Sequence, residues 1–511
     1  MQSISRKKRS ITNVAMALLS QILTTLIGML LPRALMINYG SETNGLITSM
    51  QQVISYLTLI DGGILSAVAV SLYKPIAEDD TTLVNKILSS AKQFYRKIGV
   101  IFCIALSSVA VIYPRIIAKT QFEYWEIAIM VLLIGVNGAT QILFIGKYKA
   151  LLIASQRNGI VLTINALSTV LYSLILILVS YFKISVIVGL MLAVTSYCAR
   201  AVAFYLVVRR SFPKYDFNDH NSDIKFPHRK DALIVQILSM LIMNGGVLIM
   251  SILKAPMELL SVYSVYNLIL SAVFMLMYSV ENSVTSALGN LVAKESLMHI
   301  QKSYEKFDSA YHILWTWVVG CVAVLTIPFV KVYTKGIQDI QYVLQVESLL
   351  FICICALWML RNQQTLLMTA RGNFKDMRNH MSIEAIITIF GGMLLYKKFG
   401  LKGILIAKSF ATLYSMVCFM EYNYNHILHM GIGQKLKRIF VSIFAIACLK
   451  IVAHVLNFGA VGVSIIHWGI TASVTAVLAA VIIFVWWYIF LKNEINDVID
   501  IIKGIIKRKL K

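Results

Sequence analysis

Charged residues are scarce in this sequence: they make up 14% of 511 residues, whereas hydrophobic residues make up 58% and the mean hydropathy is +0.76. A soluble protein carries about 25% charged residues. The deficit extends along the whole chain, and apolar runs long enough for a membrane-spanning helix recur from Ile11 to Leu491. This pattern excludes a soluble domain with a nucleic-acid-binding surface, although the formal net charge is +23.

The sequence also lacks the period-two alternation of β-strands. Only helices and closed barrels satisfy their backbone in lipid, so the predicted fold class is an all-α polytopic membrane protein. The seven cysteines lie within apolar runs and show neither metal-ligand nor loop-disulfide spacing, which leaves no predicted metal site. The first apolar run follows basic residues 6–9 but is too long for a secretory signal and lacks its cleavage site, so we expect a retained helix.

Hydropathy predicts about fourteen transmembrane helices. The predicted spans are 12–37, 45–73, 98–113, 124–146, 159–182, 184–208, 232–253, 258–293, 309–332, 343–368, 379–396, 403–428, 439–456 and 463–491.

The distribution of basic residues orients these spans. With the N-terminus inside, the cytoplasmic segments, including 435–438, hold most of the 47 lysines and arginines. The positive-inside rule then predicts a multi-pass protein of the cell membrane with both termini in the cytoplasm, although 396–402 places three lysines outside. Trp486, Trp487 and Tyr488 are typical of an interfacial aromatic belt, and the basic amphipathic tail is expected to lie on anionic lipid.

The longest polar interruption, 211–231, divides the first twelve spans into two groups of six. Glu42 and Glu258, which lie 216 positions apart, both occupy a first outer loop, and the same shift aligns Lys86 with Lys302 and Tyr95 with Tyr311. We therefore predict two six-helix lobes related by a parallel pseudo-two-fold repeat, an arrangement typical of transporters. The predicted domains are an N-lobe (1–210), a cytoplasmic linker (211–231), a C-lobe (232–430), helices thirteen and fourteen (431–491) and the tail (492–511).

The segment PRALMINYGSETNGLITSMQQVISYLTLIDGGILSAV (32–68) resembles the opening of the polysaccharide transporter family, the O-antigen and capsule flippases. The matching positions are Tyr39, Gly40, Gly45, Asp61 and Gly62, together with a basic residue late in the first helix. This family belongs to a superfamily that includes multidrug carriers and the lipid II flippase. The resemblance implies a flippase that moves an undecaprenyl-diphosphate-linked oligosaccharide to the outer leaflet for surface polysaccharide biosynthesis. The resemblance also implies polysaccharide polymerase and assembly proteins as partners.

Such a cargo carries an anionic diphosphate, which fixed positive charge in a cavity can stabilise. Basic residues at membrane depth are costly and usually face a cavity or a partner. Arg33 and Arg361 are the main candidates for binding the diphosphate and the sugars, and Lys408 is a third. Arg33 can instead extend to the headgroups, because it lies near the outer end of its helix. Arg200 and Lys450 can simply extend or pair. The excess of basic over acidic residues at this depth favours an anionic cargo.

Two lysines and two carboxylates complete the candidate site. Lys147 and Lys149 are either an ordinary cytoplasmic helix end or a gate that meets the diphosphate on entry. Asp61 and Glu281 lie deep in apolar helices and, under the shift of 216, fall within one turn of matching positions. Each can pair with a buried arginine, or can bind a proton or sodium ion and couple transport to a gradient. We expect no other cofactor, since no phosphate-binding loop for ATP is present.

Three competing functions stay open. A membrane enzyme of polysaccharide assembly needs acidic or His–Asp pairs in sizeable external loops, and the predicted external loops are short. A drug or lipid II exporter of the same superfamily shares the predicted fold. A scaffold without transport activity could use the tail and the middle loop.

Overall fold

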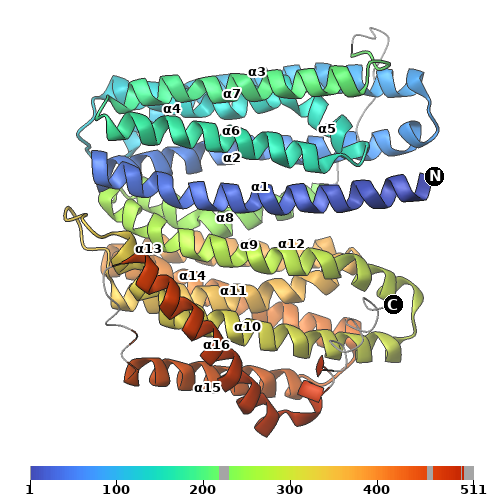
Figure 1. Ribbon diagram of the computed structural model, residues 1–511, viewed down its shortest axis with the longest axis vertical. Helices are drawn as coiled ribbons and strands as arrows, with labels where there is room; N and C mark the ends of the chain where they lie inside the picture. The colour runs from blue at the N-terminus through green and yellow to red at the C-terminus, as the bar shows by residue number, and fades with distance from the viewer. Residues whose placement is uncertain (1, 218–229, 457, 459–463, 497, 500–511) are drawn as a thin grey trace. The chain divides into compact units, whose positions relative to one another are not determined.

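The computed structural model describes residues 2–217, 230–456, 458, 464–496 and 498–499, and these residues form helices joined by short turns, with no β-strand among them (Figure 1). The first group of helices is α1 (Gln2–Tyr39), α2 (Ser41–Ala77), α3 (Thr81–Ile116), α4 (Tyr124–Thr140), the π-helix η1 (Gln141–Ile145), α5 (Gly146–Ala154), α6 (Asn158–Tyr181) and α7 (Val186–Ser211). The second group is α8 (Lys230–Ile252), α9 (Met257–Lys294), α10 (Leu297–Tyr333), α11 (Gln345–Arg371), α12 (Phe374–Ile386), η2 (Ile387–Gly391), α13 (Gly392–Phe399), α14 (Leu401–Tyr422) and η3 (Asn423–Leu428). The last two are α15 (Gly433–Val455) and α16 (Ile465–Phe490).

Each of the fourteen predicted spans matches, to within two residues at either end, one of these helices or part of one, or a run of directly joined helices. Twelve helices in the described residues are long and apolar enough to cross a membrane, or thirteen if the two arms of α2 count as one span. The arms, Ser41–Leu59 and Ile64–Ala77, meet at a bend of 42°. The charged run α12–η2–α13 is not among the twelve. The chain is therefore an all-α, multi-pass membrane protein with slightly fewer clear spans than predicted.

The shift of 216 positions recurs in the helix boundaries. Three helices of the first group begin 216 positions before a helix of the second group: α2 and α9 at Ser41 and Met257, α3 and α10 at Thr81 and Leu297, and α6 and α12 at 158 and 374. The packing repeats as well. Helix α3 packs on α4 as α10 packs on α11, and α4 packs on α7 as α11 packs on α14. We call α1–α7 the first half and α8–α14 the second half.

The chain divides by compactness into two units, residues 1–240 with 250–262, and residues 241–249 with 263–511. This division falls inside α8 and α9. The predicted lobe boundary at 211–231 lies mostly outside the described residues, so the two predicted lobes stay a prediction.

The motif residues at the start of α2 have direct structural reasons. Gly40 connects α1 to α2 with a backbone φ of 88°, a value that residues other than glycine rarely adopt. Gly45 faces the start of α9 so closely that a Cβ atom there would lie 1.8 Å from the carbonyl oxygen of Met257. The Tyr39 hydroxyl donates a hydrogen bond to the carbonyl oxygen of Ile184, at 2.5 Å. Tight helix packing thus explains this part of the resemblance.

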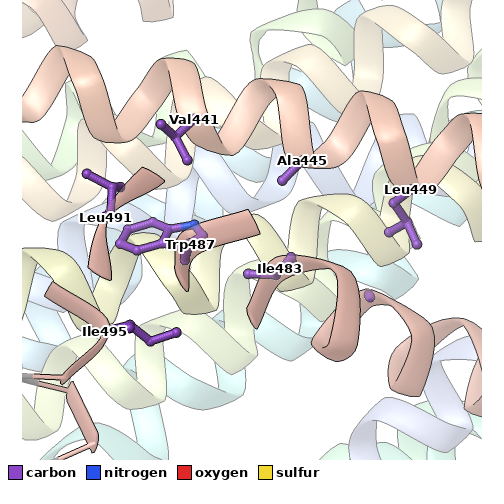
Figure 2. Packing of buried hydrophobic residues seen from close by; sticks show 8 residues of the cluster. Val441, Ala445, Leu449, Ile483, Trp487, Leu491 and Ile495 are labelled. Atoms are coloured by element: carbon purple, nitrogen blue, oxygen red, sulfur yellow. The ribbon is translucent and has the colours of Figure 1, made fainter. Parts of the chain in front are cut away.

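Helices α15 and α16 pack against α10 through one apolar cluster. Figure 2 shows Trp487 of α16 among Val441 of α15 and the residues that follow α16, Leu491 and Ile495. Trp487 is fully buried, so the prediction that it belongs to an interfacial belt is wrong for this residue. The period-3.6 pattern that would have separated it from Tyr488, which is exposed, was hidden because the whole helix is apolar.

The predicted tail, 492–511, begins with protein contacts. Ile495 is buried in the same cluster and Ile499 packs against it. Ile495 and Ile499 therefore contact the protein, and of the segment 497–511 that was predicted to lie on lipid, only residues 498 and 499 belong to the described residues. Residues 500–511, which carry the basic groups of the tail, lie outside the described residues.

Candidate functional site

Arg361 lies in the middle of the second half, paired with a carboxylate. Its guanidinium donates a hydrogen bond to the Glu384 side chain of α12 at 2.8 Å, and both side chains are buried. The guanidinium carbon also lies 5.4 Å from the centre of the Phe419 ring. Arg361 Nε and Glu384 Oε1 are buried without a hydrogen-bond partner among the described residues. The pair thus keeps one donor and one acceptor for another group.

Lys408 of α14 is buried beside this pair. Its ammonium donates a hydrogen bond to the carbonyl oxygen of Met243 in α8 at 2.8 Å, and it is attracted electrostatically to Glu384. The structure therefore brings two predicted site residues, Arg361 and Lys408, to one carboxylate that was not predicted. Glu384 stands in the apolar run MSIEAIITIF, and a carboxylate in such a run is the signal that could have identified it.

Glu281 of α9 is 1% exposed and accepts a hydrogen bond from the Tyr311 hydroxyl at 2.9 Å and another from the Asn362 amide. Asn362 adjoins Arg361 in α11, so Glu281 is linked to the same part of the second half. Both of these hydrogen-bond donors are neutral groups. Asp61 lies on the helical backbone of α2 at its bend, and its side chain lies outside the described residues.

The remaining candidates lie in the first half. Arg33 is half-buried near the end of α1, as predicted. Lys147 and Lys149 are half-buried in α5, which continues from η1 to Ala154, so they lie within a helix and not at its end. The Lys147 ammonium lies 4.9 Å from the centre of the Tyr148 ring.

A second charged cluster joins α10, α11, α15 and the segment after α16. We call Asp308, Lys435, Arg438 and Glu494 the four-charge network. Asp308 is paired with Lys435 and, at 2.5 Å, with Arg438, which also binds Glu494 at 2.6 Å. The Gln363 amide donates to Asp308 at 2.5 Å and the Ser309 hydroxyl donates to Glu494 at 2.9 Å. All four charged side chains are buried.

This network places two basic residues of a predicted cytoplasmic segment inside the protein. Residues 435–438 were counted among the cytoplasmic segments, and Lys435 and Arg438 lie in the first turns of α15 and are buried. Their partners lie far away in sequence, and Lys435 and Asp308 are 127 positions apart. A charge at the end of an apolar run is usually in water, so hydropathy alone favours the wrong environment here.

Buried charge is balanced in the residues that the structure describes. The sequence suggested an excess of buried basic groups, and the structure shows none, because buried carboxylates equal buried cations in number. The buried cations are Arg200, Arg361, Lys408, Lys435 and Arg438, and the buried carboxylates are Glu281, Asp308, Glu347, Glu384 and Glu494.

No model of a known protein family matches the chain, and no curated protein sequence matches it. Several solved structures do. An inward-facing multidrug resistance transporter of the MATE family, in the MOP superfamily, has a TM-score of 0.62 at 12% identity, covering 82% of this chain and 98% of that one. The lipid II flippase MurJ in its inward closed conformation has a TM-score of 0.62 at 14% identity, covering 92% of this chain and 98% of that one. A MOP-superfamily transporter from Pyrococcus furiosus has a TM-score of 0.58 at 12% identity, covering 82% and 96%.

The chain has the fold of MOP-superfamily transporters. At these identities the similarity concerns the fold alone. The extent of the alignments differs in an informative way. Residues before Gly433 amount to less than 92% of the chain, so the alignment with MurJ includes some of the residues from Gly433 onward. An alignment over 82% can fit entirely within the residues before α15.

Proposed function

We propose that this protein is a flippase that moves undecaprenyl-diphosphate-linked oligosaccharides from the inner to the outer leaflet by alternating access, for surface polysaccharide biosynthesis. The observation that carries the proposal is the alignment over 92% of the chain with MurJ, a flippase of lipid II. The segment 32–68 supports a polysaccharide cargo through its resemblance to capsule and O-antigen flippases. Polysaccharide polymerase and assembly proteins, together with anionic lipids, are the partners that this function implies.

The arrangement around Glu384 supports a mechanism for holding the diphosphate. Arg361 and Lys408 carry two positive charges against the one negative charge of Glu384, and all three side chains are buried. A phosphate group that approaches Arg361 competes with Glu384 for the guanidinium, whose Nε is unused. Glu384, displaced from Arg361, is attracted to Lys408. This exchange keeps each buried charge paired throughout, which a membrane interior requires.

The other candidate residues take supporting roles in this proposal. Arg33 binds the diphosphate or the sugars from α1, and Lys147 and Lys149 meet the cargo as it enters from the inner leaflet. Asp61 and Glu281 bind the coupling proton or sodium ion. The two neutral hydrogen-bond partners of Glu281, Tyr311 and Asn362, suit either state of that carboxyl group.

Disruption of the gene tests the function. We expect lipid-linked repeat units to accumulate in the inner leaflet and surface polysaccharide to fall. A matched plasmid that supplies the unaltered protein is expected to restore both. Unchanged lipid intermediates together with unchanged surface polysaccharide would refute the proposal.

Substitutions in the same cells test the site. We expect Arg361→Gln and Arg33→Gln to reduce flipping of the labelled lipid-linked oligosaccharide while the protein still inserts in the membrane. Arg200→Gln removes a buried arginine whose partners are Asn137 and Thr140, and it is the matched control. Normal flipping by both candidate variants would contradict a role of these arginines in binding the cargo. Arg33 would then only extend to the lipid headgroups, and Arg361 would only pair with Glu384.

The balance of buried charge favours a second candidate, a multidrug exporter of the same fold. A cationic drug binds to carboxylates, and Glu281 and Glu384 offer two buried ones with unused capacity at Glu384. The same disruption separates the two functions. An exporter predicts greater sensitivity to cationic dyes with normal lipid intermediates, whereas the flippase predicts the reverse.

A further inference from the structure

A cavity of about 240 Å³ lies among α10, α11 and α15, apart from the residues around Glu384 and from the four-charge network. It is near the end of α10, the start of α11 and the end of α15. The predicted topology places this end at the outer surface. Its walls on α10 are apolar and include Val324 and Ile327.

The polar groups of the cavity come from two helix faces. Lys450 and His454 are four positions apart on α15, so they share one face, and both line the cavity. Gln345 and Ser348 are three positions apart on α11 and line it from the opposite helix. No carboxylate is among the described lining residues. The lining therefore carries the positive charge of Lys450.

The Ser348 hydroxyl is a buried group without a partner. The residue is 2% exposed, and its oxygen makes no hydrogen bond with the described residues. Two other buried hydroxyls of this half donate to the carbonyl oxygen four positions earlier, Thr326 to Val322 at 2.6 Å and Thr412 to Lys408 at 2.9 Å. A buried polar group without a partner costs free energy, and a bound acceptor would remove that cost.

The start of α11 adds to the positive potential. Gln345 is its first residue, and the backbone N–H groups of a first helical turn favour an anion. Glu347 belongs to the same turn, but it is buried, interacts with Tyr266 of α9 and does not line the cavity.

The surroundings indicate that the anion belongs to a lipid. Leu349, which lines the cavity, is 56% exposed, and Ile451 and Val455, which follow the lining residues Lys450 and His454, are 65% and 76% exposed. In a membrane protein such side chains contact hydrocarbon. A free anion would have to reach the cavity past them, whereas a lipid brings both a charged head and an apolar chain.

We propose that this cavity binds the phosphate group of an anionic phospholipid, with Lys450, His454 and the Ser348 hydroxyl as its ligands and the acyl chain against the exposed apolar side chains. The proposal goes beyond transport and is measured without it, so its failure leaves the proposed function untouched.

The test is lipid binding to the purified full-length protein in neutral detergent. Phosphatidylglycerol, phosphatidylcholine with the same chains, and inorganic phosphate are added separately, and binding is followed by native mass spectrometry and by the midpoint of thermal unfolding. We expect phosphatidylglycerol to bind and to raise the midpoint, with phosphatidylcholine binding more weakly and inorganic phosphate at millimolar concentration having no effect. Equal effects of the two lipids would overturn the proposal, and protection by inorganic phosphate would show a free anion to be the ligand instead.

Variants separate this site from the general attraction of a basic protein for anionic lipid. We expect Lys450→Gln to weaken phosphatidylglycerol binding about fivefold, the effect of one lysine near a lipid phosphate. Lys331→Gln removes the same charge from an exposed position on α10 that does not line the cavity, and it is the matched control. Ser348→Ala is expected to weaken binding without any change in charge. The proposal is wrong if Lys450→Gln and Lys331→Gln have equal effects, or if Ser348→Ala binds like the unaltered protein.

Discussion

The two halves of the repeat bury polar groups in different ways. In the described part of the first half, the one buried charged side chain is Arg200, which donates to the side-chain oxygen of Asn137 at 2.7 Å. The second half buries six charged side chains, and three more belong to α15 and the segment after α16. The residue of the first half that corresponds to Glu384, 216 positions earlier, is Ser168. Its hydroxyl donates a hydrogen bond to the backbone carbonyl oxygen of Ser196 at 3.1 Å.

The comparison shows that helix packing at this position does not require a charged residue, so the charges of the second half need another explanation. The packing of α6 on α7 recurs as that of α12 on α14, so a hydroxyl at Ser168 suffices for this packing where Glu384 stands in the other half. Buried ion pairs give little net stability, because desolvation offsets their attraction. The charges of the second half are thus better explained by ligand binding around Glu384 and by specific attachment of α15 in the four-charge network.

The largest effect is expected at Asp308. Asp308→Ala leaves Lys435 and Arg438 buried with one carboxylate between them, and we expect a loss of about 5 kcal/mol in unfolding free energy. Arg200→Gln in the first half leaves only neutral partners, and we expect about 1 kcal/mol. Thermal unfolding of the purified proteins measures both. Equal losses would remove the distinction between the halves.

A smaller effect is expected when the two halves are made alike. Glu384→Ser gives the second half the residue of the first half and leaves Arg361 buried without its carboxylate, at a cost of about 3 kcal/mol. Adding Arg361→Met is expected to restore most of the loss, because the unpaired charge is then absent. Unfolding of the single and double variants forms a double-mutant cycle. Failure of the second substitution to restore stability would mean that Glu384 acts through other partners.

The contact at Gly45 tests the motif that the sequence resemblance singled out. Gly45→Ala places a methyl group against the backbone of Met257, and we expect a loss of about 2 kcal/mol. Gly28→Ala in α1 is the matched control, because no atom lies within 4 Å of a Cβ atom there. Unfolding midpoints that fall equally for both variants would contradict the close approach.

The smallest effect is expected at two matching helix starts. Asp80 begins α3 and accepts a hydrogen bond from the backbone N–H of Leu83 at 2.9 Å, whereas Ser296, 216 positions later, makes no side-chain cap. That hydrogen bond is the main cause of a lowered pKa of Asp80, and the hydrogen bond from the Thr82 hydroxyl is the second. The stabilisation is therefore present above the usual pKa of an aspartate, about 4, and is lost as the pH falls through the lowered value.

We accordingly expect Asp80→Ala to lower the unfolding midpoint at pH 7 more than at pH 3, and Ser296→Ala to have a smaller effect at both. A midpoint difference for Asp80→Ala that is independent of pH would show that its cap does not depend on charge.

Hydropathy predicted the helices well because the membrane makes the apolar run the dominant local signal. The repeat was predictable for the same reason, since Ser41 and Met257 follow loops in the same register. Burial of polar residues was not predictable in this way. Trp487 and Tyr488 are neighbours in one apolar helix. The packing against α10 and α15 buries Trp487 and leaves Tyr488 exposed.

The candidate site was predicted in part. Arg361 and Lys408 were identified because basic groups at membrane depth are rare, and the structure places them near one carboxylate. That carboxylate, Glu384, had the same kind of signal and was missed. Asp308 and Lys435 had none, because each stands beside the end of an apolar run and their pairing joins segments 127 positions apart.

The four-charge network also has a consequence for the order in which the protein is assembled. Asp308 is synthesised first, then Lys435 and Arg438, and Glu494 last, after α16. Until that segment leaves the ribosome, the two cations share a single carboxylate, so α15 cannot reach its final electrostatic environment. Docking of the segment after α16 is thus the closing step of biogenesis for this end of the chain. A nascent protein that stops short of Glu494 would carry an unneutralised arginine, a feature by which membrane quality control could distinguish it from the finished protein.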